Sequence, residues 1–260
     1  MSEMQIDYLH KIKRQRIIIN VLRLLVGFLF IAIWEFAAYT GHINSFIFSS
    51  PSRIIKLFFT MCRDGTLFAH LGITIYETII SFILVMIIGI GVAVILWIFT
   101  SLSKILEPYL VMLGSLPKSA LAPVLIVWLG NNMKTIIVAA VSVAVFGTII
   151  TLHNHFNEID SDMSKLIKTL GGSRKDIMTK VLLPASIPII ISTMKVNIGL
   201  SLVGVIIGEF LAANKGLGYL IIYGSQVFML DMVIMSIFLL CILSMILYGI
   251  INLLEKKFSK

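Results

Sequence analysis

The residues best equipped for chemistry form a short stretch near the middle of the chain. His153, His155, Glu158, Asp160 and Asp162 carry side chains of the types that bind metal ions. Their spacing matches no established zinc or calcium pattern. We therefore expect them to cap helices and to form a polar exit from an apolar segment, without a bound metal.

A second group consists of ionisable residues inside or beside long apolar runs. Charge at membrane depth is costly, so such residues usually face a bundle interior or snorkel to an edge. Glu77 and Glu107 lie close enough to predicted boundaries for an interfacial position to suffice. Glu209 comes late in its apolar run, and we expect it to have a structural or gating role near an outer mouth.

Pro117 and Lys118 interrupt another apolar run. Proline removes a helical hydrogen bond and clashes with the preceding turn, and non-helical backbone at membrane depth must be buried or line a cavity. We expect a broken span here. A simple kink at a helix–helix contact is the open alternative. Pro117, Lys118 and Glu209 are our candidates for a translocation path.

Enzyme chemistry finds little support in the sequence. It contains no nucleophile elbow, no HExxH zinc motif and no convincing Ser–His or paired-acid set. Nothing matches G-x-x-x-x-G-K-[ST], the loop that holds nucleotide phosphates. We expect no catalytic residues and no cofactor bound by this chain. A polytopic membrane enzyme of unknown reaction is the alternative class.

The composition is that of a membrane protein. The 260 residues are 58% hydrophobic and 13% charged, whereas soluble domains carry about 25% charged residues. A helix needs about 20 apolar residues to cross a bilayer, and continuous runs favour helices over the alternating strands of a barrel. We predict an all-α membrane protein whose single transmembrane domain covers residues 17–254. Its expected spans are residues 17–39, 71–99, 105–129, 134–152, 185–212 and 228–252.

The distribution of basic residues predicts the orientation. Lys and Arg are concentrated in the tails 1–16 and 255–260 and in the loop 153–184, which fall on one side of a six-span protein. Because cytoplasmic loops carry the excess of basic residues, both termini and this loop are expected in the cytoplasm of a multi-pass cell-membrane protein. Topology explains the net charge of +8, so we expect no nucleic-acid partner.

Two connections are too long to be turns. In the first, Ser50 before Pro51 predicts a helix start, with an apolar face for the membrane surface or for neighbouring helices. In the loop 153–184, apolar residues recur at helical spacing on both sides of Gly171-Gly172-Ser173. Glycine permits the backbone angles that end a helix, and Ser173 with Asp176 resembles a capping box. The pattern predicts a helix, a tight turn and a second helix.

This loop resembles that of binding-protein-dependent ABC importer permeases. Their loop has the form E-A-A, three residues, G, nine residues, I-x-L-P. Here Gly171, Val181, Leu183 and Pro184 fall in register, whereas Lys165-Leu166-Ile167 replaces the E-A-A triplet. Further segments resemble the sulfonate, taurine and nitrate branch of these permeases: Ser49-Ser50-Pro51, Gly114-Ser115-Leu116-Pro117, Ala122-Pro123, Trp128-Leu129-Gly130, Gly208-Glu209 and Gly216-Leu217-Gly218-Tyr219.

The resemblance implies the transmembrane domain of a type I ABC importer. It implies a second permease copy, two ATPase subunits that use the ATP, and an external substrate-binding protein. It also implies that the ATPases dock on residues 160–184. The coupling residues expected from it are Lys165, Leu166, Ile167, Leu170, Gly171, Gly172, Ser173, Val181, Leu183 and Pro184. The branch carries small solutes: sulfonates, taurine, nitrate, bicarbonate and thiamine pyrimidine precursors, of which a sulfonate is our first expectation.

Overall fold

The computed structural model describes residues 3–158 and 161–258, and this part of the chain is helical without strands. The predicted all-α class is confirmed. Five of the described helices are long and apolar enough to cross a membrane individually. Four of them lie within α1 (Glu3–Tyr39), α4 (Thr66–Ile98), α7 (Met133–Glu158) and α12 (Leu230–Phe258), and the fifth, Arg174–Ala212, contains α10 (Leu183–Ala212) and the helical turns that lead into it.

The sixth candidate span is broken, as the sequence predicts. Helices α5 (Thr100–Ser115) and α6 (Lys118–Leu129) meet at an angle of 95°, and together they are long and apolar enough to form a membrane span. Between them, Leu116 has an extended backbone. Proline disfavours helical angles in the residue before it, so Pro117 places the bend at this position.

The helices extend beyond the predicted apolar runs. Residues 1–16 and 255–260 were expected to form polar tails, yet α1 begins at Glu3 and α12 ends at Phe258. Likewise, the expected loop 153–184 starts inside α7. Hydropathy marks only the part of a helix that crosses lipid, and polar flanks continue the same helix into water.

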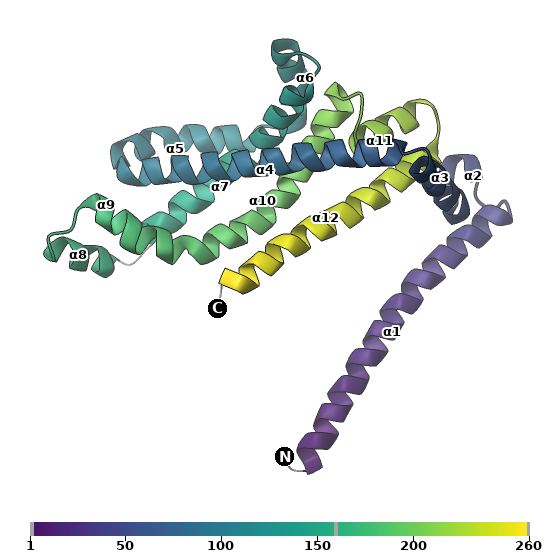
Figure 1. The fold of residues 1–260 in the computed structure, drawn as a ribbon, viewed down its shortest axis with the longest axis horizontal. Helices are drawn as coiled ribbons and strands as arrows, with labels where there is room; N and C mark the ends of the chain where they lie inside the picture. Colours follow the sequence, from purple (N-terminus) through teal and green to yellow (C-terminus); the bar gives the residue numbers. More distant parts are fainter. Residues whose placement is uncertain (1–2, 159–160, 259–260) are drawn as a thin grey trace.

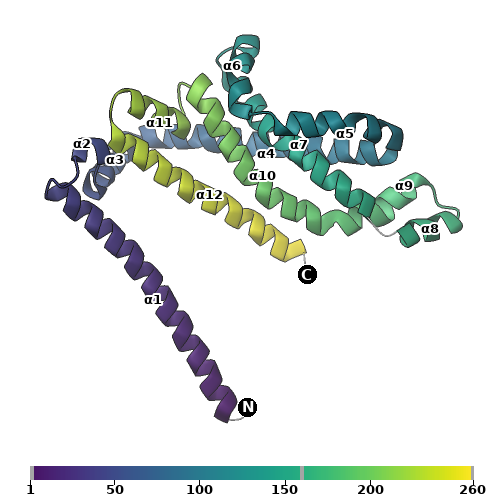
Figure 2. The same cartoon turned by 180° about the vertical axis from the view of Figure 1, so that it is seen from behind.

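Figures 1 and 2 show how the long helices are arranged. Helices α4, α7, α10 and α12 pack together, whereas α1 diverges from them and approaches the others near α2 (Ser45–Phe48) and α3 (Pro51–Arg63). The most apolar window of α1 has no buried residue. Short helices lie at the two ends of the bundle: α2, α3 and α11 (Leu217–Gln226) at one end, and α8 (Ser161–Thr169) and α9 (Arg174–Ile177) at the other.

Helices α10 and α7 approach each other closely. A Cβ atom added at Gly204 would lie 2.6 Å from the Ala140 Cα atom, and one at Gly208 would lie 2.9 Å from the Ile136 Cγ2 atom. Small residues of this kind let two backbones approach within a membrane. At the middle of the contact, the Asn197 amide donates a 2.8 Å hydrogen bond to the Thr148 hydroxyl.

Replacement of Gly204 by alanine is expected to destabilise the bundle, because the added methyl group meets the backbone of α7. Overpacking of this kind costs about 1–3 kcal/mol. Thermal unfolding of the purified chain in detergent measures the effect. Gly199→Ala is the matched control on the same helix, since a Cβ atom there would meet nothing within 4 Å. Equal melting temperatures for the two variants would contradict this packing.

Helix α3 (Pro51–Arg63) begins where the sequence predicts. The Ser50 hydroxyl accepts the Arg53 amide, and Pro51 stands in the first turn. Ser49 is buried and donates to the Asp231 carboxylate at 2.6 Å, while Arg53 forms an ion pair with Asp231 at 2.8 Å. The Ser49-Ser50-Pro51 motif therefore starts α3 and also fastens it to α12.

Some apolar residues of α3 are buried against the rest of the protein, and others are exposed. Ile54 and Met61 are buried in the core, whereas Ile55 and Phe59 are exposed. Helix α3 packs against α4 and α12. Packing against neighbouring helices is thus one role of this face, and the exposed pair remains available to lipid.

Candidate coupling site

A helix–turn–helix element occupies one end of the bundle. It consists of α8 (Ser161–Thr169), the turn 170–173, α9 (Arg174–Ile177) and a π-helical segment, η1 (Met178–Leu182), that runs directly into α10. The predicted arrangement of two helices around a glycine turn is confirmed. Figure 1 shows α8 and α9 projecting beyond the ends of the long helices.

The turn ends α8 with a Schellman motif. The Gly172 amide donates to the Ile167 carbonyl at 2.8 Å, and the Gly171 amide donates to the Lys168 carbonyl at 3.0 Å. Gly171 has a φ of +79°, which glycine adopts without strain. A Cβ atom at Gly172 would lie 2.5 Å from the Ile167 Cγ2 atom. Both glycines are therefore needed, one for its backbone angle and the other for close packing.

A capping box starts the second helix. The Ser173 hydroxyl accepts the Asp176 amide at 3.3 Å, and the Asp176 carboxylate accepts the Ser173 amide at 2.9 Å. Lys180 forms an ion pair with Asp176 at 3.2 Å. This confirms the predicted capping box and gives the second helix a fixed beginning.

The π-helical segment explains how Pro184 is accommodated. Proline lacks an amide and its ring clashes with the carbonyl four residues earlier. Immediately before it, the chain widens so that the Leu183 amide bonds to the Met178 carbonyl, five residues back. The helix therefore continues across the proline, and α9, η1 and α10 form one mechanical unit.

The element presents apolar side chains at its tip and buries others at its base. Leu170 is 76% exposed, and Leu166 is also exposed. Ile177 and Leu182 are buried, Leu182 in a cluster with Phe156. Arg174 adds a 2.5 Å hydrogen bond to the Ile98 carbonyl at the end of α4. The tip is therefore accessible to other molecules, while the base is packed against the bundle at the start of α10.

The predicted coupling residues separate into two groups by exposure. Lys165, Leu166, Leu170, Gly171 and Ser173 are exposed on the element, as is Pro184, while Ile167, Gly172, Val181 and Leu183 are partly buried. Sequence reasoning missed the residues of the base. These residues are Trp97, Phe156 and Arg174. They lie far apart in the chain, Arg174 among ordinary polar residues, and no local sequence pattern indicates that they meet.

Lys118 lies at the break between α5 and α6. Its ammonium group donates to the Leu113 carbonyl in the last turn of α5 and lies 5.1 Å from the centre of the Phe146 ring. A cation at a helix C-terminus is electrostatically favoured. In this structure Lys118 thus stabilises the broken span. A position of Pro117 and Lys118 on a translocation path stays a prediction.

Glu209 lies at the centre of a buried hydrogen-bonded cluster at the opposite end of the bundle, which we call the Glu209 latch. It is 0% exposed, and its carboxylate accepts the Thr74 hydroxyl at 2.7 Å and the Gly218 amide at 2.5 Å. The Thr74 hydroxyl in turn accepts the Leu217 amide at 2.8 Å. This latch attaches the start of α11 to α4 and α10, near the end that carries α3.

The latch also requires Gly216 and His70. Gly216 has a φ of +124°, and a Cβ atom there would lie 2.3 Å from the Glu209 carboxyl carbon. Its amide donates to the His70 ring at 3.0 Å. The sequence drew attention to Glu209 and to the Gly216-Leu217-Gly218 segment, but not to their contact. The sequence signal that could have indicated this contact is the pair His70 and Thr74, two polar residues that lie four positions apart on an apolar helix.

Two expectations for polar residues need correction. Glu77 is 1% exposed, rather than interfacial, because α4 begins at Thr66 and carries this residue deep into the bundle. His153 is buried and lies 2.7 Å from the Ser103 hydroxyl on α5, so it joins two helices instead of forming a polar exit.

The residues of metal-binding type in the stretch 153–162, which were expected to bind no metal, are described only in part. Asp160 and the side chain of Asp162 lie outside the described residues. Among the residues that are described, no three His, Cys, Asp or Glu side chains gather as a metal site requires.

Comparison with known proteins points to one family. The model of the binding-protein-dependent transport system inner membrane component matches residues 85–260. This range includes the broken span, the helix–turn–helix element and Glu209, whereas His70 and Thr74 precede it.

Individual relatives and a solved structure agree. The chain is 27% identical over 241 residues to a Bacillus subtilis protein named as an aliphatic sulfonates transport permease, SsuC, covering 91% of this chain and 86% of that protein. It is 20% identical to the Escherichia coli taurine transport permease TauC, with 88% and 85% coverage. The fold is similar to that of a chain of the MetNI methionine ABC transporter in an inward-facing conformation, with a TM-score of 0.65, 19% identity, and coverage of 74% and 96%.

Proposed function

The chain belongs to the binding-protein-dependent transport system inner membrane components, and from this premise we propose that a pair of such subunits carries a small sulfonated anion. It is the permease subunit of an ABC importer, a multi-pass membrane protein rather than an enzyme. An ABC importer permease works with ATPase subunits and a substrate-binding protein. Our proposal specifies two permease copies, two ATPases docked on residues 160–184, and an external binding protein.

The observation that carries the proposal is the helix–turn–helix element fused to α10. Its tip exposes Leu166 and Leu170, and its second helix continues through η1 into a long helix of the bundle. When two ATPase subunits close on nucleotide, they would displace the tip. Because α9, η1 and α10 are continuous, the displacement would reach Glu209 at the far end of α10.

The orientation in the membrane follows from charge. Helix α1 ends and helix α12 begins at the end of the bundle that carries α3 and α11, so both termini lie away from that end, as α8 and α9 also do. Under the positive-inside rule, we infer that the basic tails and the basic loop 153–184 lie on the cytoplasmic side. The Glu209 latch then faces the external binding protein.

The substrate class rests on the names of relatives. SsuC and TauC are named for aliphatic sulfonates and taurine, which share a sulfonate group. Nitrate, bicarbonate and thiamine pyrimidine precursors are the competing substrates to include in a test.

Reconstitution of the complex tests the proposal. The permease, the ATPase and the binding protein encoded by neighbouring genes are incorporated into proteoliposomes, and uptake of a radiolabelled alkanesulfonate is measured. We expect ATP-dependent uptake that unlabelled taurine reduces and nitrate does not. Uptake without the ATPase would overturn the importer mechanism, while ATP-dependent uptake of nitrate alone would overturn the substrate class.

A further inference from the structure

A cationic pocket lies between the helix–turn–helix element and the bundle, with a volume of about 330 Å³. Its apolar base contains Phe156, Ile177 and Leu182, all of which are buried. Three cations from α8 and α9 contribute to its wall. The described lining residues are Trp97, Thr100, Phe156, Asn157, Lys165, Lys168, Arg174, Ile177, Val181 and Leu182.

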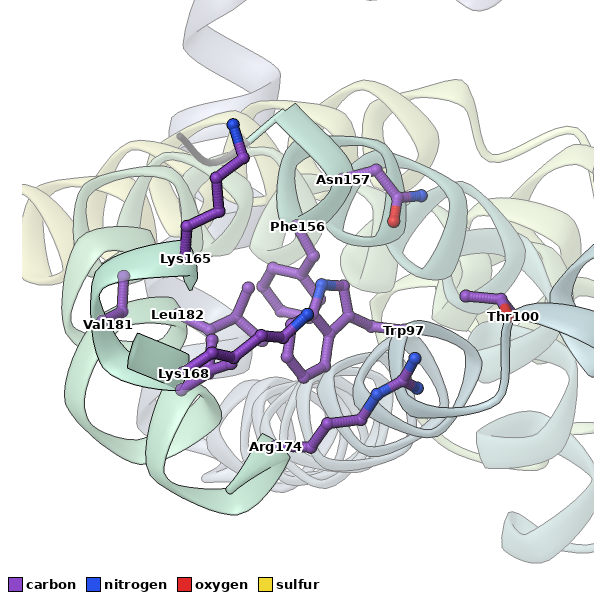
Figure 3. Close-up of a pocket in the computed structure, with 10 residues that line it drawn as sticks. Trp97, Thr100, Phe156, Asn157, Lys165, Lys168, Arg174, Val181 and Leu182 are labelled. Carbon is purple, nitrogen blue, oxygen red and sulfur yellow. The ribbon is translucent and has the colours of Figure 1, made fainter. Parts of the chain in front are cut away.

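Figure 3 shows the arrangement of the polar groups. Lys168 and Arg174 extend into the pocket on the side of the helix–turn–helix element, and Asn157 approaches from the end of α7. Lys165 extends away from them and is already engaged in an interaction. Lys168 and Arg174 are therefore the cations that carry the inference.

The lining residues that the structure describes do not balance the charge of Lys168 and Arg174. None of them is acidic, and Asp176, two residues after Arg174, is paired with Lys180. Arg174 uses one N–H group for the Ile98 carbonyl, and its guanidinium has further donors. Arg and Lys side chains recognise phosphate through charge-assisted hydrogen bonds.

We propose that this pocket binds a phosphate group. Lys168 and Arg174 would contact its oxygens, with Asn157 and Thr100 as neutral hydrogen-bonding partners. Trp97 lies at the end of α4, where aromatic residues mark a membrane interface, so an anionic phospholipid headgroup can supply the phosphate. A free phosphate compound from the cytoplasm has the same chemistry. The site goes beyond the proposed transport function and does not depend on it.

The pocket and the docking tip are separate parts of the element. Leu170 and Gly171 are not among the described lining residues, and Trp97 and Thr100 belong to α4 and α5. A phosphate bound here would bridge α9 to the base of the bundle while the tip stays accessible. It would then strengthen the connection between the docking element and α10.

Direct binding to the purified full-length chain tests this site without any ATPase. Calorimetric titrations in a neutral detergent use three probes: dihexanoyl phosphatidylglycerol, dihexanoyl phosphatidylcholine and inorganic phosphate. We expect saturable binding that is weakened at least about tenfold in Lys168→Gln/Arg174→Gln, the factor for loss of one charge-assisted contact. The variant Lys175→Gln/Lys180→Gln removes the same charge from the same loop outside the pocket, and should bind as wild type does.

The probes distinguish the two sources of phosphate. Tighter binding of phosphatidylglycerol than of inorganic phosphate assigns a lipid headgroup, and the reverse assigns a free compound. Binding to the wild-type chain should also weaken as NaCl is raised and change the fluorescence of Trp97, a change that is lost in Trp97→Phe. This second measurement needs no charge-changing variant.

Two outcomes would overturn the proposal. One is the absence of saturable binding by any probe; if Lys168→Gln/Arg174→Gln then also fails to retain the ATPase, the pocket receives an acidic side chain of that subunit instead. The other is equal weakening in the two double variants, which would indicate nonspecific attraction to a basic loop.

Discussion

Replacement of Gly171 by tryptophan is expected to reduce ATP-driven uptake at least tenfold per purified complex while the permease still folds. Gly171 stands at the apex of the docking element with a φ of +79°, and a Cβ atom there would meet nothing within 4 Å. The indole therefore extends outward, away from the permease core. It adds bulk where we propose that the ATPase docks, and it adds about 1–2 kcal/mol of backbone strain in the turn.

The measurement compares uptake and ATP hydrolysis in the same proteoliposomes. We expect less solute transported per ATP hydrolysed, with permease yield and melting temperature close to wild type. Gly171→Asn is the matched control, because asparagine tolerates left-handed backbone angles and adds little bulk. A Gly171→Trp complex with wild-type uptake would show that the tip of this element does not couple ATP hydrolysis to transport.

Replacement of Glu209 by alanine is expected to release the opposite end of the bundle. It removes the acceptor for the Thr74 hydroxyl and the Gly218 amide, both buried donors. Each donor left without a partner costs about 1–3 kcal/mol, and the cavity adds to this cost. We expect a melting temperature lower by several degrees and faster amide hydrogen exchange in residues 213–220.

Two further variants make this result specific. Glu209→Gln preserves the size and one acceptor oxygen, so its loss of stability should be smaller. Gly216→Ala keeps the carboxylate but places a methyl group where it lies, and should be as destabilising as Glu209→Ala. If Glu209→Ala had the same melting temperature as the wild-type chain, the latch would not fix the start of α11.

The sequence predicted the features that neighbouring residues determine. The Gly171-Gly172 turn, the Ser173–Asp176 capping box, the start of α3 at Ser50 and the break at Pro117 each depend on backbone preferences within a few residues. Such preferences act before any tertiary contact forms, so a single sequence is enough to recognise them.

Contacts between distant segments could not be predicted in the same way. The Glu209 carboxylate meets Thr74 across 135 positions, and Ser49 meets Asp231 across 182. A buried hydroxyl or carboxylate leaves no periodic pattern that identifies its partner. Glu77 illustrates the consequence, since its place near an apparent boundary suggested the interface whereas α4 carries it into the core.

The helix ends and the pocket were missed for related reasons. Hydropathy measures transfer into lipid and does not register helical turns that continue into water, such as the first turns of α1 and the last turns of α7. The phosphate pocket joins the end of α4 to a loop about 70 residues later. In the sequence, its basic residues are like those of an ordinary cytoplasmic loop. Only the fold shows that Trp97 and Phe156 lie beside them.

We propose that an ATPase engages the exposed tip of the 160–184 element from the cytoplasm. A single reactive thiol tests this docking: Leu170→Cys in a chain whose Cys62 and Cys241 are replaced by serine. A membrane-impermeant maleimide is applied to right-side-out and inverted vesicles, with and without the ATPase. We expect labelling only in inverted vesicles, reduced several-fold when the ATPase is assembled. Labelling from the outside, or labelling that the ATPase leaves unchanged, would contradict it.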